Sequence, residues 1–214
     1  MIQRICAKNV LQLILVICVS SVQAGAYEDF FKAVELDDRR TITQLLRRGF
    51  DVNAPSESGQ SALFLAVRSG SHQAAAALLE SPELKVDHAN QANETALMMA
   101  ALRGQLEWCK RLVERGAAVN REGWTPLHYA ATGPNPQTVS FLLERGARVD
   151  ALSPNGTTPL MMAARYGDEG SVSILLSAKA DPKLRNQKDL GPADFAKDAG
   201  REALATRLAA LARQ

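Results

Sequence analysis

The sequence predicts an all-α fold, a solenoid of about six helix-turn-helix units joined by β-hairpin-like fingers. A short motif centred on leucine recurs about every 33 residues from residue 30 onward, and an apolar stretch ending in glycine recurs downstream of it. Such self-similarity is the signature of a repeat architecture. Aromatic residues make up only 5% of the chain, so the core must be built mainly from Ala, Leu and Val, which suits closely packed helices.

The first motif reads as the start of a helix. Thr125, Pro126 and Leu127 show its full form: the threonine hydroxyl can cap the helix, proline fits the first turn, and leucine points into the stack. The small alanines that follow let neighbouring helices approach closely. The motif recurs at spacings of 34, 30 and 33 residues, and Phe30 and Ala193 extend it at both ends. The central leucines are Leu63, Leu97, Leu127 and Leu160.

Glycines recur at three kinds of position in the repeat units. The glycines of one set end the second helix of their units, where a left-handed residue is favoured. In the fifth unit Lys179 stands in place of this glycine. A second set lies in the fingers, where positive φ is needed, and a third set allows the chain to turn between helices. The three sets are Gly49, Gly116 and Gly146; Gly59, Gly123 and Gly156; and Gly70, Gly104 and Gly167.

These motifs resemble the ankyrin repeat, which has a period of about 33 residues and a Thr-Pro-Leu-His-x-Ala signature. The resemblance extends from residue 27 to about residue 212, and residues 25–214 are expected to form one ankyrin-repeat domain. The charged residues of its end units, Arg201 among them, are expected on the polar outer faces that such arrays need. The expected units are 27–55, 56–89, 90–120, 121–151, 152–184 and 185–214.

One finger departs from the pattern. Residues 120–123 are about three residues short of the usual length, so we expect a stunted hairpin there. Trp124 follows directly. Two interpretations remain open: its side chain projects into solvent, where an aromatic residue serves as an interface hot spot, or it packs across the shortened finger.

The first 24 residues have the order of a cleavable secretory signal peptide. Arg4 and Lys8 precede an apolar stretch over residues 10–19, and small residues follow. That stretch is shorter than the roughly 20 residues that span a bilayer. Cleavage is expected after Ala24, with Ala26 as the alternative. The chain is similar to bacterial periplasmic ankyrin-repeat proteins, so we expect it in the periplasm or secreted, without stable membrane insertion after cleavage.

Composition bears on partners and on stability. Without the first 24 residues the chain has 23 basic and 23 acidic residues, a balance that argues against binding nucleic acid or an anionic membrane. Of three cysteines only Cys109 lies beyond residue 24, so no intrachain disulfide is expected there. Cys109 falls at an apolar helix position and is interpreted as a buried packing thiol. A monomer is expected.

No sequence pattern for catalysis, cofactor binding or metal binding is found. The three histidines do not share a helical spacing, and no phosphate loop or nucleophile motif occurs. His128 lies in the repeat signature, and the resemblance implies that it hydrogen-bonds adjacent turns. The expected function is therefore protein–protein interaction in the periplasm. Two alternatives stay open: an accessory inhibitor or stabiliser of a periplasmic enzyme, and an enzyme with a site assembled from unrelated repeats.

The resemblance also implies a partner-binding surface. In the ankyrin family the concave face, made of finger tips and the exposed side of each first helix, binds partners. Carried over by register, this face also includes Gln60, Glu94, Thr132 and Thr157. The candidate binding residues are Arg68, Leu102, Arg103, Trp124, Arg165 and Tyr166.

Overall fold

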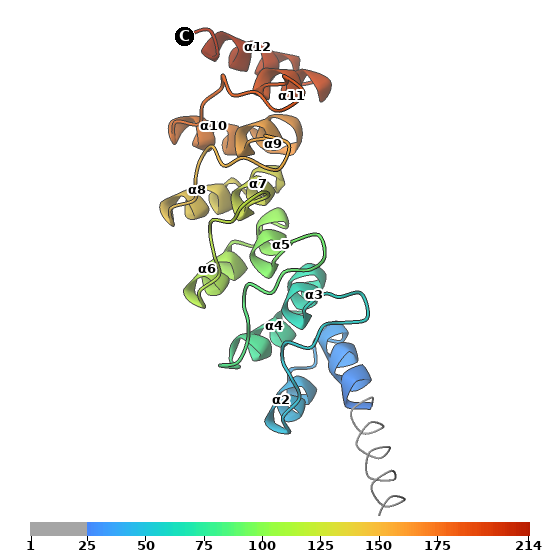
Figure 1. Ribbon diagram of the computed structural model, residues 1–214. Coiled ribbons are helices and arrows are strands. Elements are labelled where there is room, and N and C mark those ends of the chain that lie inside the picture. The colour runs from blue at the N-terminus through green and yellow to red at the C-terminus, as the bar shows by residue number, and fades with distance from the viewer. Residues whose placement is uncertain (1–24) are drawn as a thin grey trace, which may run out of the picture. The chain divides into compact units, whose positions relative to one another are not determined.

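The computed structural model describes residues 25–214, and the expected signal peptide lies outside them (Figure 1). The described residues divide into two compact units, 25–84 and 85–214. Each is a stack of helix pairs, and residues 25–214 contain the six pairs that the repeat spacing predicts. The predicted ankyrin-repeat fold is confirmed.

The first unit holds two helix pairs. A helix over residues 25–35 precedes α2 (Arg39–Arg47), and α3 (Ala62–Ser69) precedes α4 (His72–Leu79). Helix α4 packs against both α3 and α2. Phe30 and Phe64 are buried at the centre of this unit.

The second unit holds four helix pairs in two layers (Figure 1). The first helices of the pairs stack on one another, α5 on α7, α7 on α9 and α9 on α11. The second helices α6, α8 and α10 form the other layer, and α12 closes on α11. The first helices are α5 (Ala96–Leu102), α7 (Pro126–Thr132), α9 (Pro159–Tyr166) and α11 (Pro192–Asp198). The second helices are α6 (Leu106–Glu114), α8 (Pro136–Glu144), α10 (Glu169–Ser177) and α12 (Glu202–Leu211).

Three of the first helices are capped as the motif predicts, whereas the Thr125 hydroxyl at the start of α7 lies 2.9 Å from His128 Nδ1 and makes no such cap. The hydroxyl of Ser61 accepts a hydrogen bond from the backbone N–H of residue 64 at 3.1 Å, and Thr95 and Thr158 accept the equivalent bonds at 3.4 and 3.3 Å. A side-chain cap of this kind contributes about 1 kcal/mol. The four motif leucines are at most 1% exposed. The signature therefore encodes both the first turn and the buried face of each first helix.

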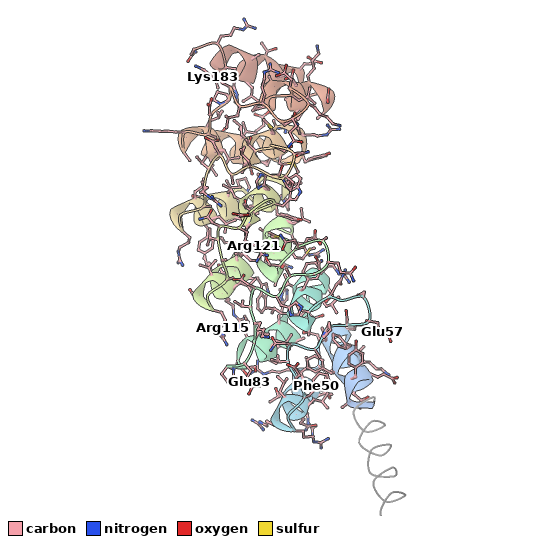
Figure 2. All side chains as sticks on the ribbon, in the orientation of Figure 1. Phe50, Glu57, Glu83, Arg115, Arg121 and Lys183 are labelled. Atoms are coloured by element: carbon pink, nitrogen blue, oxygen red, sulfur yellow. The ribbon has the colours of Figure 1, made fainter. Side chains whose placement is uncertain are left out.

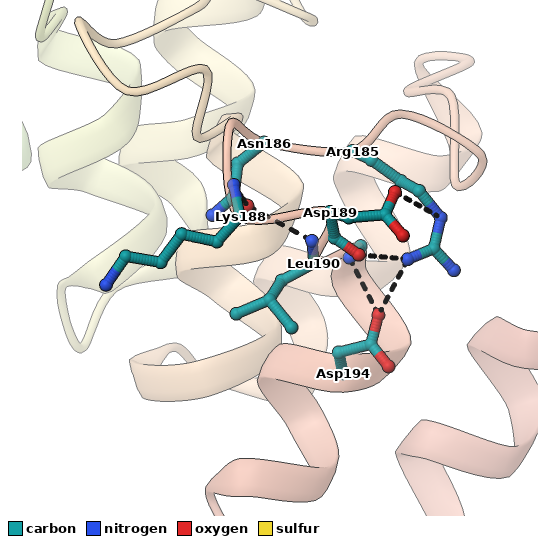
Figure 3. Close-up of polar contacts among 7 residues, drawn as sticks. Arg185, Asn186, Lys188, Asp189, Leu190 and Asp194 are labelled. Carbon is teal, nitrogen blue, oxygen red and sulfur yellow. Dashed lines mark hydrogen bonds and ion pairs between the residues drawn. The ribbon is translucent and has the colours of Figure 1, made fainter.

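Most fingers are closed by a backbone hydrogen bond across their turn. Ser56 N–H donates to Gln60 at 2.8 Å, and the fingers beginning at Asn90, Ser153 and Asn186 repeat the bond at 3.0 Å. In the last finger Asn186 Oδ1 also accepts the N–H groups of Lys188 and Leu190, at 2.9 and 3.1 Å (Figure 3). Residues 117–125 form bends without such a closing bond. The finger that the sequence predicts to be stunted is therefore stunted in the structure.

Side-chain bridges tie each finger region to the repeat that follows. Asn120 is the clearest case within the second unit, because Nδ2 donates to Gly146 O at 2.7 Å and Oδ1 accepts from Arg148 N–H at 2.9 Å. The carboxylates of Asp87 and Asp150 accept from the backbone about 31 residues later, at 3.0–3.3 Å. Backbone groups of the following repeat, at exposed or half-buried sites, are thus hydrogen-bonded by one recurring polar position.

The glycines serve two different purposes. Gly146 has φ of +83°, as predicted for a glycine that ends a second helix, and Lys179 at the equivalent position adopts φ of +67°. Gly167 lies between α9 and α10, where the chain is expected to turn, but its φ of −85° is not left-handed. A Cβ at this position would lie 2.1 Å from the carbonyl oxygen of Ala131. Gly167 is needed for the close approach of α7 and α9.

Arg201 also corrects an expectation. It was expected on the polar outer face of the last unit, yet its side chain is half-buried and turns inward. Nη1 donates to the carbonyl oxygens of Ala163, Ala164 and Gly167 at 3.0, 3.0 and 2.9 Å. These carbonyls lie at the end of α9, where a helix runs out of intrahelical donors, and Ala163 O also accepts the N–H of Gly167 at 3.0 Å. Arg201 is the C-terminal cap of a neighbouring helix.

Candidate protein-binding face

The side of the second unit that carries the first helices presents a row of half-buried apolar side chains. Met99, Tyr129 and Met162 lie two residues after the motif leucines of α5, α7 and α9. Because the helices stack in register, these three positions fall beside one another. Leu102 ends α5 on the same side. We call this surface, with Trp124 and Thr132, the first-helix face.

A pocket of about 220 Å³ opens in this face between α5, α7 and α9. It is bounded by the last turn of α5, the first and last turns of α7, and one methionine of α9. Its lining residues are Leu102, Trp124, His128, Tyr129, Thr132 and Met162.

Trp124 occupies the base of the shortened finger, and neither sequence interpretation holds alone. Its ring is half-buried and packs edge-on against the His128 ring, with centroids 5.2 Å apart and planes at 76°. Its remaining surface lines the pocket. Figure 2 labels Arg121 on the same short segment between α6 and α7. The shortened finger therefore holds the tryptophan against the helix start while leaving one side open.

His128 is a structural residue, as the repeat resemblance implies. Nδ1 lies 3.1 Å from the N–H of Thr125, which donates to it, and Nε2 lies 2.9 Å from Thr157 O. An imidazole that accepts at Nδ1 and donates at Nε2 is neutral. Burial lowers the pKa of His128 to about 4, so the ring stays uncharged at neutral pH. Trp124 thus packs on an uncharged, fixed surface.

Tyr129 is fixed by a chain of polar contacts. Its hydroxyl donates to Glu94 Oε1 at 2.9 Å, and Asn90 Nδ2 donates to Glu94 Oε2 at the same distance. Burial, together with the nearby Glu94 carboxylate, raises the pKa of Tyr129. The ring is therefore a rigid wall of the pocket, and the carboxylate beside it is already engaged.

The predicted binding residues separate into groups. Leu102 and Trp124 line the same pocket. Arg165 stacks over Tyr166, 5.3 Å from the ring centroid, and pairs with Asp198 at 3.6 Å; Tyr166 is 58% exposed.

Two arginines and a threonine complete the account of the predicted face. Arg103 is exposed at the end of α5. Arg68 belongs to the first unit, where it lies 5.8 Å over the Phe64 ring. Thr157 is expected on the binding face, and this is wrong, because it is 2% exposed. Its backbone is held by hydrogen bonds with His128 and Ser153, both at 2.9 Å.

Sequence reasoning missed three pocket residues, namely Tyr129, Met162 and His128, which borders the pocket although it is only 1% exposed. A signal for two of them was present. Tyr129 and Met162 occupy the same register position two residues after the motif leucine, and that position carries large apolar side chains in α5, α7 and α9. A row of large apolar groups at a position that a helix leaves half-exposed marks a contact surface.

Other chemistry finds little support in the described residues. Within residues 25–214 no group of three or more His, Cys, Asp or Glu side chains could hold a metal ion. In the same range no helix combines the length and apolar character needed to cross a bilayer. Cys109 is fully buried, as predicted, and burial raises the pKa of its thiol to about 12.

The structure combines stacked helix pairs, fingers closed by hydrogen bonds and a half-exposed apolar face. These features define a repeat protein that binds other molecules. The chain belongs to the ankyrin-repeat family: the family model described as "Ankyrin repeats (3 copies)" matches residues 30–122 and 115–186. Ankyrin repeats are protein-binding modules.

Several proteins are similar to this chain. The nuclear factor NF-kappa-B p105 subunits of Gallus gallus and Mus musculus are 32% and 34% identical over 74% and 67% of this chain. The chain spans only 17% and 16% of their lengths.

Two bacterial structures are similar in fold over most of their length. One is a chain in the complex of a predatory endopeptidase from Bdellovibrio bacteriovorus with an immunity protein, at 28% identity and a TM-score of 0.73. The match covers 85% of this chain and 97% of that one. The other is an ankyrin repeat domain from Acinetobacter baumannii AYE, at 26% identity and a TM-score of 0.71, covering 85% and 96%.

Proposed function

We propose that this chain is exported and binds a partner protein through the first-helix face of its second unit. The observation that carries the proposal is the pocketed row of half-buried apolar side chains on α5, α7 and α9. Aromatic and methionine side chains are enriched where proteins bind one another. The rigid placement of Trp124 and Tyr129 keeps the entropy lost on binding small.

Site-specific photo-crosslinking tests the face. A benzoylphenylalanine placed at Thr132, in the pocket wall, should trap a partner in cells. The same group at Gln137, exposed on helix α8, is the matched control. Crosslinks from position 137 and none from position 132 would contradict the proposed face.

Export rests on the pattern of residues 1–24 and is tested separately. Fractionation of the producing cells, followed by N-terminal sequencing of the mature chain, should give Gly25 as the first residue, or Tyr27 if the alternative site is used. A chain that retains Met1 in the cytoplasmic fraction would contradict export.

A second candidate function is inhibition or stabilisation of one exported enzyme. The similarity to a chain from an endopeptidase–immunity protein complex favours this candidate over a general scaffold. A single crosslinked partner with hydrolase activity, slowed by stoichiometric addition of the purified chain, would support it. Several unrelated partners crosslinked at position 132 would favour a scaffold instead.

A further inference from the structure

The pocket on the first-helix face has properties that specify what enters it. Resting on the function proposed above, we propose that it takes a single leucine-sized apolar side chain of the partner protein. We further propose that Arg103, which directly follows the pocket residue Leu102, pairs with a carboxylate next to that side chain. The recognised element is then an acidic–apolar step in an exposed segment of the partner.

The size of the pocket selects a side chain rather than a small-molecule ligand. Its volume is about 220 Å³, whereas sites for drug-sized ligands and cofactors have about 300–1,000 Å³. Leu102 and Met162 supply flexible aliphatic walls, and methionine adapts its shape to what it contacts. The rings of Trp124 and Tyr129 supply rigid ones.

The polar groups of the lining are nearly all engaged. Tyr129 donates its hydroxyl to Glu94 at 2.9 Å, both ring nitrogens of His128 have partners, and the Thr132 hydroxyl donates to His128 O at 2.9 Å. Among the lining residues this leaves the indole N–H of Trp124. A polar ligand would find few hydrogen-bond partners to replace those it loses from water. The occupant is therefore apolar.

Charge around the pocket selects what flanks that occupant. Glu94 keeps its negative charge, but both of its carboxylate oxygens already accept hydrogen bonds from Tyr129 and Asn90. Arg165 is paired with Asp198 at 3.6 Å. Arg103 directly follows Leu102, is exposed, and forms no ion pair within residues 25–214.

Two further acidic residues near these segments are engaged elsewhere. Glu107, four residues after Arg103, pairs with Lys110 at 2.7 Å. Glu122 borders a separate pocket, whose lining also carries Arg121, Arg148 and Asp150. Arg103, next in sequence to the pocket residue Leu102, is therefore an exposed cation without an ion pair in residues 25–214, and the complementary partner group is a carboxylate.

The methionines provide a direct test. The full-length mature chain is labelled with 13C at its methionine methyls, and three blocked pentapeptides are titrated in, with the cores Glu-Leu, Lys-Leu and Glu-Ala. Met162, in α9, reports on the pocket. Met98 in α5 and Met161 in α9 are both 0% exposed and serve as internal controls.

The Glu-Leu peptide should shift the Met162 methyl and leave Met98 and Met161 unchanged. Loss of the apolar side chain in the Glu-Ala peptide should weaken binding about tenfold. The charge reversal in the Lys-Leu peptide should weaken it about threefold, as for an exposed ion pair. The Arg103→Glu variant should invert the preference between Glu-Leu and Lys-Leu, and because Arg103 is exposed this variant should fold normally.

Two results would overturn the inference. One is the absence of a selective Met162 shift with all three peptides up to their solubility limits. The other is equal binding of the Glu-Leu and Lys-Leu peptides to the unmodified chain. Crosslinking from position 132 separates this failure from failure of the proposed function: if it still traps a partner, the face binds protein and only the assignment of the pocket is wrong.

Discussion

Replacing Arg201 by methionine should remove the cap on α9 while keeping most of the side-chain stem. Nη1 reaches three carbonyl oxygens, but it carries only two hydrogens, so the three acceptors share them. Each hydrogen bond to a charged donor contributes about 1.5–3 kcal/mol. Water can partly replace the donor because the side chain is half-buried. We expect a loss of about 2 kcal/mol, or about 6 °C in Tm.

The matched control is Arg207→Met, an exposed position on the neighbouring helix α12. An exposed substitution of this kind should change stability by less than about 0.5 kcal/mol. Urea unfolding followed by circular dichroism gives both values, and hydrogen exchange of the last amides of α9 shows whether the loss is local. If the two variants unfold within about 0.5 kcal/mol of each other, the capping argument is wrong.

Three further outcomes follow from buried groups. Because burial lowers the pKa of His128 from 6.5 to about 4, the unfolded chain takes up this proton first, and stability should fall by about 3 kcal/mol as pH drops from 6.5 to 4. An NMR titration of the ring near 6.5 would refute this. At pH 8 Cys109 should react with a disulfide reagent about a thousandfold more slowly than a free thiol, because burial raises the pKa of its thiol to about 12. Urea should remove this protection. Rapid labelling of the native chain would show that the thiol is accessible. Gly146→Asn should lower the free energy of unfolding by less than about 1 kcal/mol, because asparagine tolerates positive φ. Gly167→Asn should lower it by about 3 kcal/mol, because it forces a Cβ against Ala131. Similar melting temperatures of the two variants would contradict the steric argument.

Much of the fold is predictable from the sequence because the signals are local and repeated. A capping hydroxyl such as Thr95 and an inward leucine such as Leu97 act within one turn, and the 33-residue period supplies the stacking. The shortened finger was also visible, as a spacing of 30 between Leu97 and Leu127.

The candidate site was only partly predictable, because it depends on distances between repeats. The register placed Leu102 and Trp124 on one face, but nothing local shows that Tyr129 and Met162 close a pocket around them. Arg201 was misplaced for the same reason. From the sequence alone, a charged residue in the last repeat is expected on the solvent-exposed end of the stack. Its actual partners are carbonyl oxygens at the end of α9, 34–38 residues earlier in the chain.

The three missing residues between Asn120 and Trp124 have a consequence for how such surfaces diversify. Helices α5 and α7 stack on each other as the intact pairs do, although the segment joining their repeats is cut short. Deletion in a finger therefore changes which side chain stands at the mouth of a pocket without altering a single core residue. A library built on this scaffold could vary finger length alone and select new recognition properties from it.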